Sequence, residues 1–424
     1  MKFPELKDAL IEKRYEEAKD MYSALNVDVE GAIDTLLSTP ISMHCWQGDD
    51  VTGFETKLSN NNGGTLVTGN HPGAATTPED LRADIDKAMS LLPGKQKLNL
   101  HAFYLESNGK QVDRDEVAPK HFSNWIDWAK EKEVGLDFNP TFFAHPKSES
   151  GFTLSNKDKG IRDFWIEHAL RCREISAEFA KELNDDVVVN YWIPDGYKDI
   201  PADRLSPRQR LADSYDKIFK DDIDSRVKEA VESKVFGIGS EEYVVGSWEF
   251  YMSYALTRKK LVCMDMGHYH PTEGVADKIS SVLNFLDEAL IHVSRPIRWD
   301  SDHVVIQNDD LQNLMKEIVR CDALKRVYLA TDFFDASINR IGAWVTGIRA
   351  TQKALLIALL EPKCIKELET EGLLATRLAM MEETKALPFG DIWNYVCLKT
   401  GVPAGAAWIN DVTQYEKDVL FKRK

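Results

Sequence analysis

The sequence lacks an apolar run long enough to cross a membrane. Its longest aliphatic run, Ala354 to Leu360, falls far short of the ~20 residues that span a bilayer. The first twenty residues are charged and have no apolar core, so we expect no secretory signal. Basic residues are also in deficit, since 53 Lys and Arg face 69 Asp and Glu for a net charge of −16. Proteins that bind nucleic acids or anionic membranes present clustered Lys and Arg, so we expect neither partner.

Cysteine is scarce and dispersed. The six cysteines include no C-x-x-C pair, and without a secretory signal they are expected to be buried, reduced thiols of a cytoplasmic protein. Cys45 lies beside His44 and is an alternative catalytic thiolate, although adjacent residues of a strand point to opposite faces. The sequence also lacks a Walker-type phosphate loop and an H-E-x-x-H motif. The glycine pair Gly237 and Gly239 is too short for a dinucleotide fingerprint and predicts a turn.

What the sequence does contain is an alternation of short apolar runs with longer amphipathic stretches. This pattern favours parallel strands joined by helical crossovers. Eight such units predict an α/β fold, a (β/α)8 TIM barrel, with a doubly wound sheet as the alternative. The expected strands are Ile41–Trp46, Leu98–Leu105, Val134–Phe138, Val187–Ile193, Ala230–Lys234, Lys260–Asp265, Ala289–Val293 and Val327–Thr331.

The 424 residues exceed one barrel, and the remainder has a helical pattern. We expect an N-terminal helical segment over 1–40, the barrel over 41–350, and a C-terminal helical extension over 351–424 that covers the barrel or forms an oligomer contact. About fifty residues join the first two strands, with turn clusters NNGG (61–64) and GNHPG (69–73). Long loops in compact domains are frequently functional.

Polar residues gather where the expected strands end. In a barrel these ends converge on one mouth, which is where catalytic groups lie in this fold. Any one of them alone is more often structural, but their joint placement indicates an active site. The residues are Trp46, Gln47, His101, Asp137, Asn139, Trp192, Asp195, Glu232, Lys234, Asp265, His268, His292 and Asp332.

The densest part of this set predicts a metal centre. Asp300 and Asp302 form a D-x-D, which in an extended backbone projects both carboxylates to one side. With Glu232, Asp265, Asp332, His268 and His292 they make seven oxygen and imidazole donors, a set typical of Mn²⁺, Mg²⁺, Co²⁺ or Zn²⁺. Seven donors exceed one coordination shell, so two ions are expected. The alternative is a solvated acidic loop with two core histidines. His270 is either a further ligand or a loop cap.

Seven segments spread along the whole chain carry a resemblance to a known family: SMHCWQGDDVTGFE (42–55), LNLHAFYLES (98–107), NYWIPDG (190–196), ESKVFGIGSEEY (232–243), DMGHYHPTE (265–273), HVSRPIRWDSDHVV (292–305) and DFFDASINRIGAWV (332–345). Together they resemble the L-rhamnose isomerase family from end to end. The resemblance implies a (β/α)8 barrel, a homotetramer, dependence on divalent metal (Mn²⁺, with Zn²⁺ or Co²⁺ as substitutes) and interconversion of L-rhamnose and L-rhamnulose by a hydride shift between C1 and C2.

The resemblance also implies roles for individual residues. One metal site resembles a structural site formed by Glu232, Asp265, His292 and Asp332, and the other a catalytic site formed by His268, Asp300 and Asp302. Asp332 is expected to handle the oxygen proton, Lys234 to stabilise a developing alkoxide, and His101 to orient the sugar. The remaining expected substrate contacts are Trp192, Phe334, Phe103 and Val51.

Two other functions stay open on the residues alone. One is another metal-dependent barrel enzyme, an aldolase, epimerase or phosphodiesterase, although the net charge of −16 weighs against a phosphate substrate. The other is a sugar-binding protein without catalytic activity, which has no need of seven metal donors.

Overall fold

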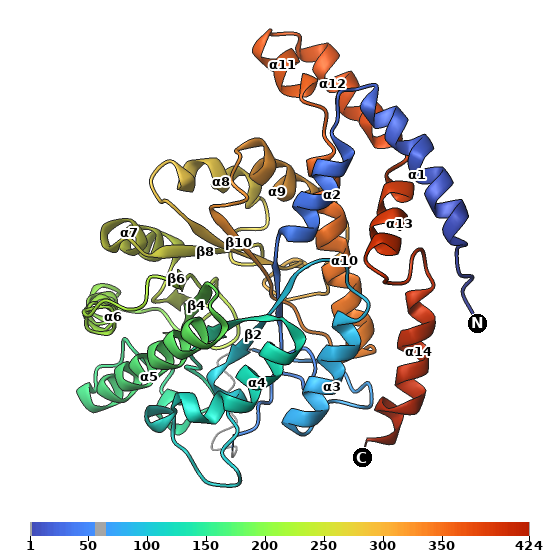
Figure 1. Ribbon diagram of the computed structural model, residues 1–424. Coiled ribbons are helices and arrows are strands. Elements are labelled where there is room, and N and C mark those ends of the chain that lie inside the picture. The colour runs from blue at the N-terminus through green and yellow to red at the C-terminus, as the bar shows by residue number, and fades with distance from the viewer. Residues whose placement is uncertain (1, 56–64, 424) are drawn as a thin grey trace.

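The protein is a closed parallel barrel surrounded by helices (Figure 1). The computed structural model describes residues 2–55 and 65–423, and within these ranges eight parallel strands pair in the order β1-β10-β9-β8-β6-β4-β3-β2. The closed order confirms the predicted barrel over the doubly wound alternative. The strands are β1 (Ile41–His44), β2 (Gln96–His101), β3 (Gly135–Asn139), β4 (Val187–Trp192), β6 (Val227–Glu232), β8 (Leu261–Asp265), β9 (Ala289–Val293) and β10 (Val327–Thr331).

The helices between the strands bury one apolar face each. In α9, Leu311, Leu314, Met315 and Ile318 recur at spacings of three and four and are buried, and Asn308 caps the helix by accepting from the Leu311 N–H. Each of the eight barrel strands is followed along the chain by one of these helices. In chain order they are α3 (Pro78–Met89), α4 (Ser123–Lys132), α5 (Lys159–Leu183), α6 (Leu205–Ile218), α7 (Trp248–Arg258), α8 (Ala276–Leu283), α9 (Asp309–Arg320) and α10 (Arg340–Leu359).

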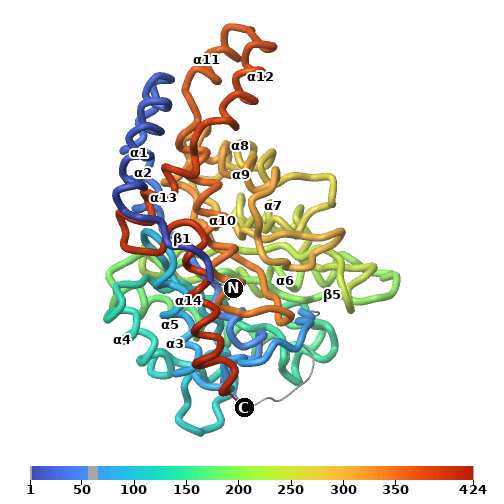
Figure 2. The backbone as a smooth tube through the Cα atoms, turned by 90° about the vertical axis from the view of Figure 1, so that its right-hand side faces the viewer, coloured from blue at the N-terminus to red at the C-terminus, as the bar shows by residue number. Residues whose placement is uncertain are grey.

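Further helices lie outside the barrel on one side. The long helix α10 crosses the boundary expected at residue 350. In Figure 1, the N-terminal helix α1 runs beside α13, and α14 continues along the same side. Figure 2 shows α11 and α12 projecting from one end of the molecule. These helices are α1 (Asp8–Ser23), α2 (Val29–Ser38), α11 (Cys364–Thr370), α12 (Leu374–Glu383), α13 (Phe389–Lys399) and α14 (Trp408–Asp418).

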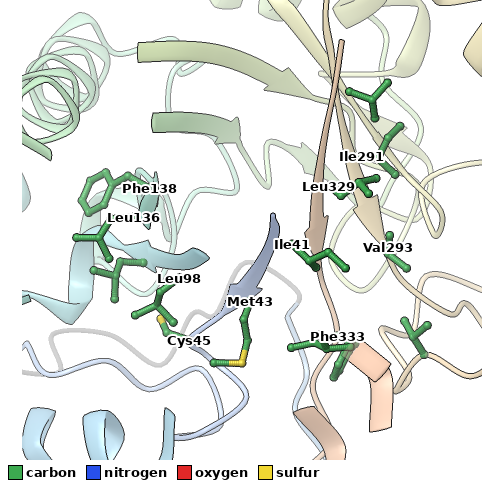
Figure 3. Close-up of a cluster of buried hydrophobic side chains, with 14 of the residues drawn as sticks. Ile41, Met43, Cys45, Leu98, Leu136, Phe138, Ile291, Val293, Leu329 and Phe333 are labelled. Carbon is green, nitrogen blue, oxygen red and sulfur yellow. The ribbon is translucent and has the colours of Figure 1, made fainter. Parts of the chain in front are cut away.

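Two apolar clusters occupy opposite faces of the barrel sheet. The larger joins strand and helix side chains, including Ile41, Met43, Leu98 and Leu136 (Figure 3). The smaller takes the alternate positions of five neighbouring strands: Val188, Ala230, Leu261, Cys263, Leu290 and Ala330. Because adjacent strand residues point to opposite faces, the smaller cluster fills the interior of the barrel.

The structure departs from the sequence-based expectations in several local features. A two-stranded antiparallel sheet of β5 (Gly196–Tyr197) and β7 (Tyr243–Val244) was not predicted. Strand β2 starts two residues earlier than expected and ends at His101, because residues 102–104 turn into a 3-10 helix. Of the turn clusters in the long connection, GNHPG is described, with Gly69 and Gly73 at positive φ (129° and 91°), whereas NNGG lies outside the described residues.

The cysteines are free thiols, and four of the six are buried. The expectation that all are buried is wrong for Cys321, which is exposed, and for Cys364, which is half-buried. Burial raises the pKa of the Cys45 thiol well above its ordinary value, which argues against a catalytic thiolate there. None of the described helices is long and apolar enough to span a bilayer.

Candidate metal centre and cavity

Four candidate metal donors follow the interior cluster at the mouth of the barrel. In three strands, and directly after the end of β10, the donor lies two residues after an interior apolar residue and so faces the same side of the sheet. The donor side chains therefore form the next interior layer above the apolar one. The pairs are Ala230 and Glu232, Cys263 and Asp265, Leu290 and His292, and Ala330 and Asp332.

These four donors form the first group, whose ligand atoms all lie within 4.8 Å of one another. His292 is at its centre: its Nδ1 lies 3.3 Å from Glu232 Oε1, 3.6 Å from Asp265 Oδ2 and 3.2 Å from Asp332 Oδ2. Asp265 and His292 are register partners on adjacent strands, which sets their separation. The group consists of the same four residues as the structural site that the family resemblance implies. A second set, Glu232, Cys263 and His292, satisfies the same distance limit.

Asp265 also belongs to an outer group with His268 and Asp300, again with all ligand atoms within 4.8 Å. His268 Nε2 lies 3.2 Å from Asp300 Oδ2. The Gly267 N–H donates to Asp265 Oδ1 over 2.6 Å, and a Cβ on Gly267 would lie 2.5 Å from Asp300 Oδ1. Glycine is therefore required where the backbone approaches these carboxylates. Asp265 is the carboxylate that the two groups share.

The electrostatics of the site fit divalent cations. Burial, together with the charges of Asp332 and Glu232, raises the pKa of Asp265 well above its usual range. Despite burial, the carboxylates of Asp300 and Asp265 raise the pKa of His268. Buried donor atoms also lack any hydrogen-bond partner, and a cation would satisfy them. These atoms are Glu232 Oε1, Asp265 Oδ2, His268 Nδ1, His292 Nδ1 and Asp300 Oδ1.

Two neighbouring side chains hold the carboxylates of the first group. The Asn190 amide donates to Glu232 Oε2, which leaves Oε1 for the donor cluster. The Trp46 indole donates to Asp332 Oδ1 over 3.2 Å. The sequence placed Trp46 at a strand end but gave no role to Asn190. Asn190 lies two residues before Trp192, on the same interior face, which is the pattern that could have identified it.

A cavity of about 210 Å³ opens above the metal donors. Of the expected substrate contacts, His101, Trp192, Phe334 and Val51 line it, whereas Phe103 does not. The Phe103 ring packs edge-on behind His101, with ring centres 5.6 Å apart. Lining residues that the sequence did not identify come from the loops after the strands: Leu66, Thr68, Phe143, Phe236, Trp299, Ser301 and His303.

Two nitrogen-bearing side chains, the Lys234 ammonium and the neutral His101 imidazole, line this cavity. Burial lowers the pKa of Lys234, against the opposing charges of Asp300 and Asp302, and its ammonium donates to Ser240 Oγ over 2.8 Å. Burial lowers the pKa of His101 to about 3, so its imidazole is neutral at physiological pH. His101 Nδ1 lies 3.2 Å from Thr141 Oγ1.

Asp300 and Asp302 both line the cavity, but the backbone that carries them is not extended as the D-x-D motif predicted. Asp302 has a φ of 44°, in the left-handed region, so its backbone is not extended. Asp302 lines the cavity but lies outside both four- and three-residue donor groups just described. Val51 has a φ of 56°, which is strained for a β-branched residue and places this side chain at the cavity wall.

Other strand-end residues have structural partners. Asp137 lies 2.8 Å from the Lys97 ammonium, inside the barrel below Asn139. Asp195 accepts from the backbone and hydroxyls of Thr153 and Ser155. The loop-cap interpretation fits His270, whose Nδ1 accepts from the Thr272 N–H over 3.3 Å.

Comparison with known proteins gives consistent matches over almost the whole chain. A family model described as L-rhamnose isomerase (RhaA) matches residues 9–423. The chain is 54% identical to the L-rhamnose isomerase of Listeria innocua over 415 residues, which cover 97% of this chain and 99% of that protein. The L-rhamnose isomerase of Mannheimia succiniciproducens is 53% identical with the same two coverages. That of Rhodopirellula baltica is 52% identical over 97% of each chain.

Proposed function

Because the chain belongs to the L-rhamnose isomerase family, we propose that it interconverts L-rhamnose and L-rhamnulose at the barrel mouth, with two divalent cations bound there. The observation that carries this proposal is the position of Asp265, a buried carboxylate common to two donor groups directly beneath a cavity of sugar size. Membership of an isomerase family decides against an aldolase, an epimerase, a phosphodiesterase and a catalytically inactive sugar-binding protein.

The donor set supports one cation at each group. We assign the inner site to Glu232, Asp265, His292 and Asp332, and the outer site to His268 and Asp300 with Asp265 shared and Asp302 nearby. The two assigned sites contain oxygen and imidazole ligands and no soft thiolate ligand. Such ligands favour Mn²⁺, and Zn²⁺ or Co²⁺ suit them as well. When bound, a divalent cation polarises a carbonyl and lowers the pKa of an adjacent hydroxyl.

The remaining groups of the cavity suit the proton and charge changes of the reaction. Aldose–ketose isomerisation moves a hydrogen between C1 and C2, which we assign to a hydride shift, and a proton between O1 and O2. Asp332, which lines the cavity, carries that oxygen proton. The Lys234 ammonium stabilises negative charge that develops on a sugar oxygen. The neutral His101 ring accepts or donates one hydrogen bond and so orients the sugar.

Apolar side chains of the cavity suit the carbon skeleton of a deoxysugar. Trp192 and Phe334 supply flat surfaces for C–H groups, and Val51 supplies an apolar contact for the terminal methyl. One methyl-sized contact contributes only ~1–3 kcal/mol, so L-lyxose and L-mannose are expected as slow substrates.

The C-terminal helices support assembly into a homotetramer. No residue of α12 is buried, and Leu373, Leu374 and Leu378 are exposed along or beside it. Helices that expose several leucines in a single chain are typical of a subunit contact. We place the enzyme in the cytoplasm, where its mostly buried thiols stay reduced.

Metal removal tests this function directly. EDTA-treated protein, shown to be metal-free by elemental analysis, is assayed for ketose formation from L-rhamnose before and after addition of Mn²⁺. We expect turnover to vanish and to return with Mn²⁺, and in separate portions with Zn²⁺ or Co²⁺ to a lesser extent. Full turnover by the metal-free protein would contradict metal dependence, and no rhamnulose from the Mn²⁺-loaded protein would contradict the substrate.

A further inference from the structure

We infer that Trp46 is a positioning residue, whose indole N–H holds one oxygen of Asp332 so that the carboxylate divides its two oxygens between the donor cluster and proton transfer. This inference rests on the proposed function, because it assigns Trp46 a part in the same reaction. Among the hydrogen bonds of the described residues, the Trp46 side chain reaches the first donor group through Asp332.

The topology brings these two residues together. Strand β1 pairs with β10 in parallel, with Ile41 opposite Leu329 and Ser42 opposite Ala330. Trp46 follows β1 and Asp332 follows β10, so both emerge on the same edge of the barrel. The indole Nε1 of Trp46 lies 3.2 Å from Asp332 Oδ1.

The two oxygens of Asp332 thereby have different partners. Oδ1 accepts from the indole, and Oδ2 lies 3.2 Å from His292 Nδ1 within the first donor group. Rotation of the carboxylate about its Cβ–Cγ bond would break both contacts together. Without the indole donor, Asp332 is free to turn both oxygens toward a cation, and neither then stays in place for the sugar proton.

The indole is itself fixed before any ligand binds. Trp46 is 3% exposed, and its ring meets the His101 ring edge-on with centres 4.9 Å apart at 72°. The Val51 N–H donates to the Trp46 carbonyl over 3.0 Å, which ties the backbone of Trp46 to the following turn. A donor held in this way costs little further ordering when it binds the carboxylate, which is the requirement for preorganised catalysis.

This arrangement predicts an effect on turnover more than on substrate binding. Trp46 also lines the cavity, and a residue that only formed its wall would change KM. A residue that fixes the proton carrier instead changes kcat, because the interaction matters in the transition state. The change in kcat compared with the change in KM therefore distinguishes a residue that positions Asp332 from one that only lines the cavity.

The first test is Trp46→Phe, which keeps an aromatic ring and removes the N–H. The matched control is Trp125→Phe, in a fully buried indole that donates to the Tyr104 backbone carbonyl over 3.1 Å, away from the cavity. With Mn²⁺ content measured in each protein, we expect Trp46→Phe to lower kcat about 10- to 100-fold with KM changed less than about threefold. We expect the control to keep its kcat. Equal kcat in both variants, or a higher KM with unchanged kcat, would overturn the inference.

The second test uses no activity and does not need a foldable Trp46 variant. In metal-free protein labelled with ¹⁵N-tryptophan, the Trp46 indole N–H is followed by NMR with and without Asp332→Ala. We expect its resonance to shift and its exchange with solvent to accelerate in Asp332→Ala, while the Trp125 indole is unaffected. An unchanged Trp46 resonance would overturn the inference. A parent enzyme that forms no rhamnulose would instead refute the proposed function, and this second measurement would still decide whether the contact exists.

Discussion

His292 faces Asp265 across the paired strands β9 and β8, with His292 Nδ1 3.6 Å from Asp265 Oδ2. The pairing is set by backbone register, so it does not depend on the loops of the barrel mouth. His268 and Asp300 approach the same carboxylate from those loops. One strand residue therefore joins a rigid group of donors to a second group built on loops.

The shared position of Asp265 predicts the loss of both cations when its charge is removed. In Asp265→Asn, each group loses a carboxylate ligand, so we expect metal content well below that of the parent and activity reduced more than about 100-fold. Elemental analysis of purified protein measures the first effect, and the L-rhamnose assay measures the second.

The control for this prediction is Asp137→Asn, which removes another buried carboxylate inside the barrel, paired with Lys97 over 2.8 Å. We expect this variant to lose stability and retain its cations. A parent-like metal content in Asp265→Asn would show that neither site depends on the shared ligand.

Asp49 predicts how stability depends on pH. Burial raises the pKa of this carboxyl to about 7 from 3.8, although it accepts from the Tyr104 hydroxyl over 2.6 Å and from the Gly53 N–H over 2.7 Å. Between these two pKa values the folded chain binds a proton that the unfolded chain does not. Its contribution to the free energy of unfolding is therefore complete below pH 3.8 and falls as the pH rises to about 7.

Asp49→Asn stays neutral at every pH and isolates this effect. In EDTA, urea unfolding should show parent and variant converging at low pH, and the parent less stable above pH 7 by at most ~4 kcal/mol, at ~1.4 kcal/mol for each pKa unit. The metal-free condition keeps proton release by the metal ligands out of the comparison. A difference between the two proteins that is the same at pH 5 and pH 8 would contradict the prediction.

Val51 combines backbone strain with a place at the cavity wall, and Val51→Asn separates the two. Asparagine tolerates a φ of 56° better than valine does, so we expect no loss in Tm. The polar side chain removes an apolar contact, so kcat/KM for L-rhamnose should fall about tenfold relative to that for L-mannose. A lower Tm would argue against backbone strain at Val51, and an unchanged preference between the two sugars would argue against its apolar contact with the substrate.

The exposed leucines of α12 predict the oligomer contact. Leu374 and Leu378 are 54% and 57% exposed, and replacing both with lysine places two charges in the proposed interface. Light scattering on a sizing column should give the mass of four chains for the parent and a smaller species for the variant. Leu205→Lys, at a leucine 64% exposed on α6, is the control and should leave the mass unchanged. An unchanged mass for the double variant would contradict the prediction and show that Leu374 and Leu378 of α12 do not form the oligomer contact.

The barrel itself was predictable because strands such as β4, β8, β9 and β10 are short runs of mostly buried apolar residues. The start of β2 was not, since Gln96 and Lys97 are polar and precede the apolar run that begins at Leu98. Both are buried strand residues, and the Lys97 ammonium pairs with Asp137 on the neighbouring strand, forty positions along the chain. No local pattern reveals such a partner. The two-residue strands β5 and β7 are too short to have any periodicity.

The candidate site also contains residues that were predictable from the sequence and residues that were not. Glu232, Asp265, His292 and Asp332 lie at strand ends, so their convergence on the barrel mouth was predictable from the sequence pattern, whereas their grouping into one site came from the family resemblance. The loop residues depended on backbone shape that the sequence does not encode locally. Asp302 lies in the left-handed region, which removed the basis for expecting it beside Asp300.

Phe103 lies away from its expected place for a related reason. It follows β2 in a 3-10 turn and packs behind His101, whereas an extended strand would have carried it toward the mouth. The sharing of Asp265 between two groups is likewise a property of three-dimensional distance that a list of donors does not contain.

The pairing of β1 with β10 also bears on how the site is made during synthesis. Trp46 and Asp332 are 286 positions apart, and Asp332 becomes available only after more than three quarters of the 424 residues have been joined. Contacts of such long range carry a high loop-closure entropy and form late in folding. A nascent chain or a truncated fragment can therefore build much of the sheet without a complete first donor group. Metal binding at that group, as proposed above, would therefore report that the whole ring of strands has closed.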